Sequence, residues 1–344
     1  MNNFINITKD SSGKVFLAPD VAILLGNASL AAYTDYANSQ NPNYTPPPLQ
    51  YGGTSFNFLQ RFTGFDDVVW KDGEEERYGL IYQWSARSDV YLFAFRGTSS
   101  VYDMVLDLES GETTTFHPYS NVNNFPANIS VGDGFYKIYA SKSRTMPASM
   151  QTQLFAAIKN LPTPASEIVI TGHSLGCTMA SLFTLDIAVS LPNLAIANIN
   201  FASPRVGTAN WQNIYNETYN LRNKTICIRN SYDMVPKLPP KEWPFDFKDI
   251  GEVFPVSFGL KNYHIDFPAI VLAWHALENY RYVVSRATKN SPQIWTGEFP
   301  DQSHLTWPMV SYNPYTSTSE IEESKTAEEA ERAVEKKVDE SISA

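Results

Sequence analysis

A serine with glycines two positions to either side is the clearest chemical signal in this sequence. It follows the apolar run from Glu167 to Thr171 and precedes a run of helical composition, residues 175–190. The pattern G-x-S-x-G between a strand and a helix is typical of a nucleophile elbow, a sharp turn that lifts the serine hydroxyl clear of a sheet. A chance match to three fixed positions is the alternative, and the strand before and helix after count against it. The pattern therefore predicts a nucleophile, and its residues are Gly172, His173, Ser174, Leu175 and Gly176.

A serine nucleophile needs a base, and the base needs an acid to orient it. Asp233 lies just beyond the apolar run 225–229, at the strand end where α/β sites form, whereas Asp186 falls inside a predicted helix. Asp233 is therefore the preferred acid, with an ordinary turn-forming aspartate as the alternative. The order Ser, Asp, His leaves three candidates for the base: His264, His275 and His304.

The elements that must hold these residues alternate between strand and helix patterns. Helical composition is found at residues 19–39, 135–160 (interrupted by Pro147), 175–190, 211–221 and 273–286. Strand composition is found at residues 78–84, 90–95, 167–171, 194–201 and 225–229. Short, continuously apolar strands suit a parallel sheet covered on both faces. The alternation predicts an α/β fold with a central, mostly parallel sheet flanked by helices.

The composition is that of a globular protein with a tail. Of 344 residues, 43% are hydrophobic and 13% aromatic, so a full core can be buried. We expect one α/β domain over residues 1–313. Residues 314–344 are rich in Glu, Ser, Lys and Ala and predict an acidic, solvated tail, with docking of a partner protein as the alternative.

The formal net charge of −10 argues against nucleic acid as a partner, since nucleic acid rewards basic patches. No apolar run has the length of a transmembrane helix. The residues from Met1 to Phe4 lack the start of a signal peptide, so we expect a cytoplasmic protein, with secretion through a leader missing from this sequence as the alternative. Cys177 and Cys227 each lie in an apolar stretch and are predicted to be buried thiols, although one bridge between them is left open.

Further segments resemble the class 3 lipases, the family of filamentous-fungal triacylglycerol lipases and plant phospholipase A1-like enzymes. In the family's order, they are FRGTSS at 95–100, VGDGF at 131–135, ASPRVG at 202–207, NSYDMVP at 230–236 and HALENY at 275–280. The resemblance implies an α/β-hydrolase fold with a short helical lid and a hydrolase acting on lipid esters. It places Asp233 and His275 in the triad with Ser174. Gly132, Ala202 and Cys177 depart from the family's usual residues, and none of them is a triad position.

Acyl transfer also needs preset donors for a negative oxygen. The N–H of Leu175, which follows the nucleophile, is one expected donor. Thr98 lies in the loop after an earlier predicted strand and resembles the family's oxyanion residue, so its backbone N–H is the expected second donor. An ordinary strand-end turn is the alternative for Thr98.

An amphipathic stretch follows the predicted oxyanion loop. Its apolar residues recur at i, i+3, i+4 and i+7 and therefore share one helical face: Val101, Met104, Val105 and Leu108. A helix of this kind beside the site can act as a lid whose apolar face covers the site and opens at an oil surface. A short core helix without motion fits the pattern equally well, and the resemblance favours the lid.

Together these features predict a triacylglycerol lipase that uses no metal or cofactor and meets its lipid ester at an oil–water or membrane interface. Phospholipase A1 and feruloyl-type esterase are alternatives on the same scaffold. A non-catalytic lipid-binding homologue is a third alternative, and the intact set of Ser174, Asp233 and His275 argues against it. The sequence makes no prediction of the oligomeric state.

Overall fold

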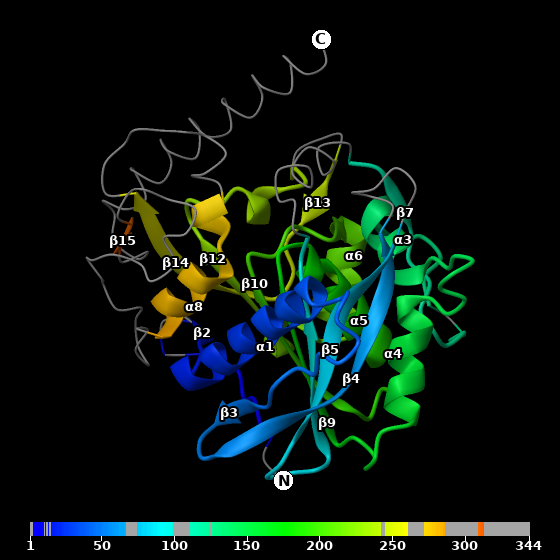
Figure 1. The fold of residues 1–344 in the computed structure, drawn as a ribbon. Helices are drawn as coiled ribbons and strands as arrows, with labels where there is room; N and C mark the ends of the chain where they lie inside the picture. Colours follow the sequence, from blue (N-terminus) through cyan, green and yellow to red (C-terminus); the bar gives the residue numbers. More distant parts are fainter. Residues whose placement is uncertain are drawn as a thin grey trace, which may run out of the picture.

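The fold is taken from a computed structural model. It describes residues 3–9, 11, 13, 15–66, 74–98, 111–123, 125–241, 245–260, 272–285 and 309–312. The predicted lid residues Val101, Met104, Val105 and Leu108 lie outside the described residues, as does the predicted tail 314–344. Figure 1 shows a twisted central sheet with helices on both faces.

The central sheet has the strand order β15-β14-β12-β10-β9-β6-β5-β4-β3. Its strands are β3 (Leu49–Tyr51), β4 (Thr54–Asp66), β5 (Glu74–Trp84), β6 (Val90–Phe95), β9 (Glu167–His173), β10 (Ala195–Phe201), β12 (Thr225–Asn230), β14 (Glu252–Leu260) and β15 (Met309–Tyr312). The middle of this sheet, from β6 to β14, is parallel, and the strands at both edges are antiparallel. The predicted parallel centre is therefore confirmed.

The described residues also form two smaller sheets. The four-stranded one has the order β13-β11-β8-β7 and consists of β7 (Thr113–Thr115), β8 (Ser130–Gly132), β11 (Gly207–Thr208) and β13 (Phe247–Lys248). The other pairs β1 (Thr8–Lys9) with β2 (Val15–Phe16).

Helices cover both faces of the central sheet. They are α1 (Pro19–Ala37), α3 (Asp133–Ala140), α4 (Met150–Lys159), α5 (Leu175–Ser190), α6 (Ala209–Asn213) and α8 (Leu277–Ser285). Short η segments lie at Ile214–Thr218, Arg222–Lys224 and Val235–Lys237. Helix α1 packs on α8, while α5 packs on α3, and in Figure 1 α1 crosses the sheet on the near side.

The two faces are distinguished by which side chains reach which helix. In the β9–β10 register, His173 of β9 pairs with Phe201 of β10, and the two side chains lie on the same face of the sheet. Asn200 precedes Phe201 on β10, so its side chain points to the opposite face. His173 reaches Tyr33 of α1, whereas Asn200 reaches Ser181 of α5. Helices α1 and α5 therefore lie on opposite faces of the sheet.

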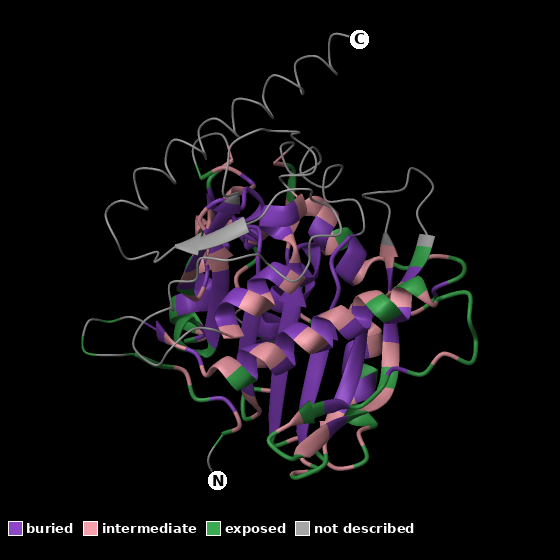
Figure 2. Ribbon diagram, turned by 60° about the vertical axis from the view of Figure 1, so that its left-hand side comes forward, coloured by how far each residue is buried: buried purple, intermediate pink, exposed green. Residues whose placement is uncertain are grey.

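The core runs through the middle of the sheet. Every residue of β6 and β9 is buried, and α5 is buried along almost all of its length. In Figure 2 the buried residues gather in the strands at the centre of the sheet and in the helices packed against them. A helix that is apolar around its whole circumference must be enclosed on all sides, and α5 meets this condition because it lies between the sheet and α3. This rigid centre carries the turn at Ser174.

The element predictions hold best where the pattern is local. Residues 175–190 form α5 as expected, and Pro147 separates α3 from α4. The predicted helix 211–221 is instead the short α6 followed by the π-helical segment Ile214–Thr218. Strands β4 and β14 were not predicted. Strand β14 contains Pro255, which removes a ladder donor and argues against a strand inside a sheet, yet it pairs with Arg229 of β12.

Both cysteines are buried and free, as the apolar surroundings predicted. Among the described helices, none combines the length and the apolar character needed to cross a membrane.

Candidate active site

Ser174 lies on a strained turn between β9 and α5. Its backbone has φ 56° and ψ −132°, a conformation that residues with a side chain rarely adopt. A Cβ atom on Gly172 would lie 2.7 Å from the carbonyl carbon of Gly176, and one on Gly176 would lie 2.3 Å from the carbonyl oxygen of Arg96. The two glycines are thus required by the close approach of three backbone segments. The strand–turn–helix geometry expected around Ser174 is present.

The predicted acid and base are in direct contact. The Nδ1 atom of His275 lies 2.8 Å from Oδ2 of Asp233, and both side chains are buried. Asp233 follows the end of β12, and His275 precedes α8. Because a carboxylate only accepts hydrogen bonds, Nδ1 of His275 carries the proton, which leaves the lone pair on Nε2. That Nε2 atom is buried and has no hydrogen-bond partner among the described residues.

Asp233 is held by two further donors. Its Oδ2 atom accepts from the Tyr280 hydroxyl at 2.7 Å, and its Oδ1 atom accepts from the Val235 N–H at 3.0 Å. The Tyr280 hydroxyl in turn accepts from the Asn230 N–H at 2.8 Å. Burial raises the pKa of Tyr280 well above its usual value, so the phenol stays protonated and acts as the donor. Tyr280 had been given no role from the sequence, although it ends the quoted segment HALENY.

Asn230 was also missed, and it fixes the chain next to His275. Its Nδ2 group donates to the carbonyl oxygens of Trp274 and Phe258, each at 3.1 Å. Its Oδ1 atom accepts from the Phe258 N–H at 2.9 Å. The side chain thereby joins the end of β12 to β14 and to the residue before His275. Only the tertiary structure shows that one amide spans these segments.

His173 joins Ser174 to His275. Its Nε2 atom lies 2.8 Å from the backbone oxygen of His275, and the two imidazole rings are 4.7 Å apart between centroids. Its Nδ1 atom lies 2.8 Å from the Tyr33 hydroxyl. Burial, followed by the nearby His275, lowers the pKa of His173 well below its usual range, so this ring is neutral. The structure therefore brings the elbow and His275 together, and it makes His173 a connecting residue as well as a part of the turn.

The predicted oxyanion residues lie beside the elbow. Leu175 is the first residue of α5, and Thr98 follows β6 and is 4% exposed. A Cβ atom on Gly97 would lie 2.7 Å from the Cβ of Ser174, so the loop that carries Thr98 packs directly against the elbow. Backbone N–H groups in such a loop and at a helix N-terminus are the donors that acyl transfer requires.

Arg96 stabilises the loop that carries Thr98. Its guanidinium donates to the Gly97 carbonyl at 2.6 Å and pairs with the buried Glu76. Its Cζ atom also lies 3.9 Å from the ring centroid of Tyr36 on α1, a cation–π contact. The segment FRGTSS pointed to this region, but the buried position of Arg96 comes from the structure.

Of the remaining candidates, the structure describes only Asp186, and it lies away from this site. His264 and His304 lie outside the described residues, as do the four predicted lid residues. Asp186 is buried on α5 and accepts from Gln151 and Tyr139, away from His275. Within the described ranges, no group of three His, Cys, Asp or Glu side chains could hold a metal ion.

A comparison with protein families recognises residues 92–243 as Lipase (class 3). This match, together with the plant relatives described next, supports membership of the class 3 lipase family. The matched stretch begins in β6 and includes Ser174 and Asp233, while His275 lies beyond it.

Curated relatives of this chain include plant proteins. Phospholipase A1-II 3 of Oryza sativa subsp. japonica is 29% identical over 260 residues, which are 70% of this chain and 57% of the relative. Phospholipase A1-II 4 of the same plant is 30% identical over 212 residues, 58% of this chain and 51% of the relative. The chain spans about half the length of the curated relatives it matches.

A solved structure supports the fold of the chain. The crystal structure of M37 lipase superposes with a TM-score of 0.51 at 17% sequence identity, covering 78% of this chain and 92% of that chain. This likeness and the parallel sheet centre confirm the expected α/β-hydrolase fold.

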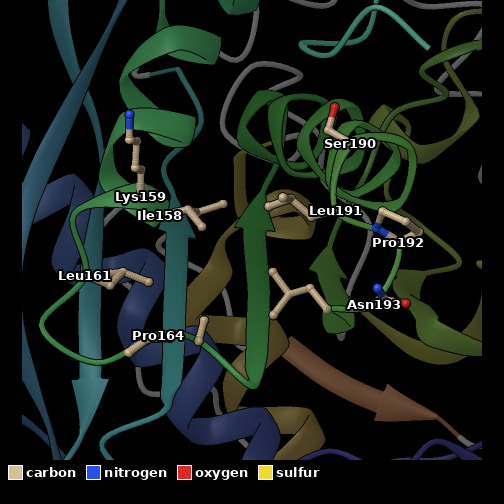
Figure 3. Close-up of a pocket in the computed structure, with 10 residues that line it drawn as sticks. Ile158, Lys159, Leu161, Pro164, Ser190, Leu191, Pro192 and Asn193 are labelled. Carbon is tan, nitrogen blue, oxygen red and sulfur yellow. The ribbon is translucent and has the colours of Figure 1, made fainter.

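A surface cavity of the protein lies away from the site. It has a volume of about 470 Å³ and is lined by the segments before β9 and β10, including Leu161, Pro164 and Leu191 (Figure 3). Ser174 follows the opposite end of β9. The cavity is therefore separated from Ser174 by the length of the strand and is no substrate pocket for it.

Proposed function

We propose that this chain hydrolyses carboxylic esters of lipids by acyl transfer to Ser174. The observation that carries the proposal is the buried contact of His275 with Asp233, 2.8 Å between Nδ1 and Oδ2, beside the strained turn at Ser174. It leaves the Nε2 lone pair of His275 as a base next to the elbow. Membership of the class 3 lipase family supports the same chemistry.

In the proposed mechanism, Nε2 of His275 takes the proton of the Ser174 hydroxyl as the serine oxygen attacks the ester carbonyl. The backbone N–H groups of Leu175 and Thr98 hold the resulting oxyanion. His275 then gives the proton to the departing alcohol, and the acyl group remains on Ser174. Water then gives a proton to His275 and attacks the acyl group, and His275 returns that proton to the Ser174 oxygen as the fatty acid leaves. Asp233 stabilises the imidazolium in both halves.

The substrate is proposed to be a glycerolipid. The sequence analysis favours triacylglycerol with a lid-gated site, in which the apolar face of residues 101–108 meets the lipid surface. The names of the plant relatives support a second candidate, phospholipase A1 activity on the sn-1 ester of a phospholipid. A feruloyl-type esterase has no comparable support.

The test measures hydrolysis of emulsified triacylglycerol, of phosphatidylcholine vesicles labelled in the sn-1 chain, and of a soluble short-chain p-nitrophenyl ester. Wild type and Ser174→Ala are assayed side by side. Loss of the nucleophile typically lowers kcat by roughly 10⁴- to 10⁶-fold, so we expect the variant to be inactive on every ester that wild type cleaves. Full activity of Ser174→Ala would refute the mechanism.

The pattern of substrates decides the finer proposal. Faster cleavage of the emulsion than of the vesicles supports the triacylglycerol lipase, and the reverse supports phospholipase A1. Cleavage of the soluble ester alone would contradict both and would remove the reason for an interfacial lid.

A further inference from the structure

The hydroxyl of Tyr33 on α1 lies where the oxyanion loop meets the nucleophile elbow. Its oxygen is 2.8 Å from Nδ1 of His173. A Cβ atom on Gly97 would lie 2.5 Å from the same oxygen, so the Gly97 backbone packs directly against the hydroxyl. The family resemblance and the element pattern gave Tyr33 no role. Its hydroxyl nevertheless contacts His173, which precedes Ser174 in the sequence, and Gly97, which packs against Ser174.

The direction of these hydrogen bonds follows from the His275 carbonyl, with which His173 also hydrogen-bonds. The carbonyl oxygen of His275 only accepts, so Nε2 of His173 must carry the proton of the bond between them. The ring is neutral, so Nδ1 is an acceptor and the Tyr33 hydroxyl donates to it. Burial raises the pKa of Tyr33, and the hydroxyl therefore keeps its proton. A directed chain runs from Tyr33 through His173 to the backbone of His275.

We propose that Tyr33 is a positioning residue for acyl transfer: its hydroxyl joins the oxyanion loop at Gly97 to His173 and, through that ring, to the backbone of His275. This inference rests on the proposed function. The oxyanion donor, the nucleophile and the base come from three segments far apart in the chain, and each must be placed to within a fraction of an ångström. A misplacement of 1 Å can lower the rate by about 10²-fold.

The hydrogen-bonded chain fixes the orientation of the His173 imidazole ring. Without the Tyr33 hydroxyl, Nδ1 of His173 loses its donor, and the imidazole is held only by its bond to the His275 carbonyl. The Gly97 backbone loses its packing contact with the hydroxyl at the same time. Both changes loosen the site while leaving Ser174, Asp233 and His275 in the protein.

Tyr33→Phe tests the proposal because it removes only the hydroxyl. With a soluble p-nitrophenyl ester we expect kcat to fall about 10- to 100-fold with KM changed less than about twofold. Tyr215→Phe is the matched control. The Tyr215 hydroxyl is also buried and hydrogen-bonded, to Thr225 at 2.8 Å and Asn198 at 3.3 Å, on the face of the sheet away from Tyr33. We expect it to lose comparable thermal stability and to keep the wild-type kcat.

A double-mutant cycle with His173→Asn tests the route of the effect. If Tyr33 acts through His173, Tyr33→Phe should lower kcat by a smaller factor in the His173→Asn background than in wild type, because the two changes break the same chain and only the contact with Gly97 is left to lose. Additive losses would show that the Tyr33 hydroxyl acts independently of His173 and would overturn the proposed chain.

The outcomes for the two proposals are distinguishable. Wild-type kcat in a folded Tyr33→Phe, with Ser174→Ala inactive, refutes the positioning role and leaves the proposed function standing. A fall in kcat equal to that of Tyr215→Phe shows a structural role only and also refutes it. A wild type inactive on all esters, or an active Ser174→Ala, overturns the proposed function and the inference with it.

Discussion

The carboxylate of Asp233 is enclosed by donors, and this explains how a charged side chain is kept beside His275. Its two oxygens accept from His275, Tyr280 and the Val235 N–H. A buried carboxylate is costly unless it is hydrogen-bonded, and these three contacts supply the hydrogen bonds that Asp233 needs in the interior. At the residue scale, therefore, the orientation of the base depends on groups that do no chemistry themselves.

Replacing Tyr280 by Phe should weaken both activity and stability. The change removes one donor to Asp233 and leaves the N–H of Asn230 without its acceptor, which costs about 1–3 kcal/mol of folding free energy. We expect kcat to fall roughly tenfold, which corresponds to about 1.4 kcal/mol in the activation free energy. Steady-state kinetics and denaturant unfolding measure the two effects.

Tyr139→Phe is the control for that variant. The Tyr139 hydroxyl also donates to a buried carboxylate, that of Asp186, at 2.9 Å. It should lose stability and keep kcat. If Tyr280→Phe retained wild-type kcat, the hydroxyl would have no part in orienting Asp233.

At the scale of elements, α5 anchors the segments packed on its outer side through Asp186. The carboxylate of Asp186 accepts from the N–H of Tyr119 and from the side chains of Gln151, Tyr139 and Ser190. These donors come from a loop, from α4, from α3 and from α5 itself. Burial nevertheless raises the pKa of Asp186 from 3.8 to about 6, because the desolvation of the charge outweighs the four hydrogen bonds.

This pKa predicts a specific dependence of stability on pH. Between pH 3.8 and about 6 the folded protein binds the proton of Asp186 more tightly than the unfolded chain does. Stability should therefore decrease as the pH rises through this window, by about 3 kcal/mol in total from this group. The contribution is fully present below the window and absent above it.

Urea unfolding of wild type and Asp186→Asn at several pH values between 4 and 7 measures this contribution. The amide does not titrate, so the difference between the two free energies should change with pH by about the predicted amount. Parallel curves for the two proteins would show that Asp186 has the same pKa in the folded and unfolded states.

At the scale of the whole molecule, the N-terminal segment closes the end of the sheet farthest from Ser174. The N–H groups of Phe4 and Ile5 donate to the carboxylate of Glu167, the first residue of β9, at 2.6 and 3.2 Å. The Phe4 ring makes edge contacts with Tyr51, Phe56 and Trp84. The segment thus joins β9 to the antiparallel edge of the sheet.

Phe4→Ala should lower global stability without changing the chemistry. Phe4 is half-buried, so we expect a loss of about 2 kcal/mol, below the 3–5 kcal/mol typical of a fully buried Phe. The melting temperature should fall, while kcat measured well below it should equal that of wild type because Ser174 follows the other end of β9. Phe4→Leu, which keeps apolar volume, should lose less. An unchanged melting temperature in Phe4→Ala would show that this segment does not support the sheet.

The sequence by itself determined the features that depend on neighbouring residues. The turn at Ser174 could be predicted because its strain and its two glycines are local, and most helices and parallel strands could be predicted from their periodicity. Strand β4 was missed although Phe56 and Phe62 are buried on it, because register shifts next to Phe58 and Phe62 interrupt the alternation. Strand β14 was missed because of Pro255. Spacing left three histidines open, and the choice of His275 depended on the family resemblance.

The tertiary structure decided which distant groups meet at the site. Tyr33, Asn230 and Tyr280 contact His173, Trp274 and Asp233 across separations of 140, 44 and 47 residues. No local pattern encodes such pairs, because they depend on the order of the strands and on which face of the sheet each helix covers. The sequence predicts that residues 19–39 are helical, but only packing α1 on the same face of the sheet as His173 aims the Tyr33 hydroxyl at the elbow.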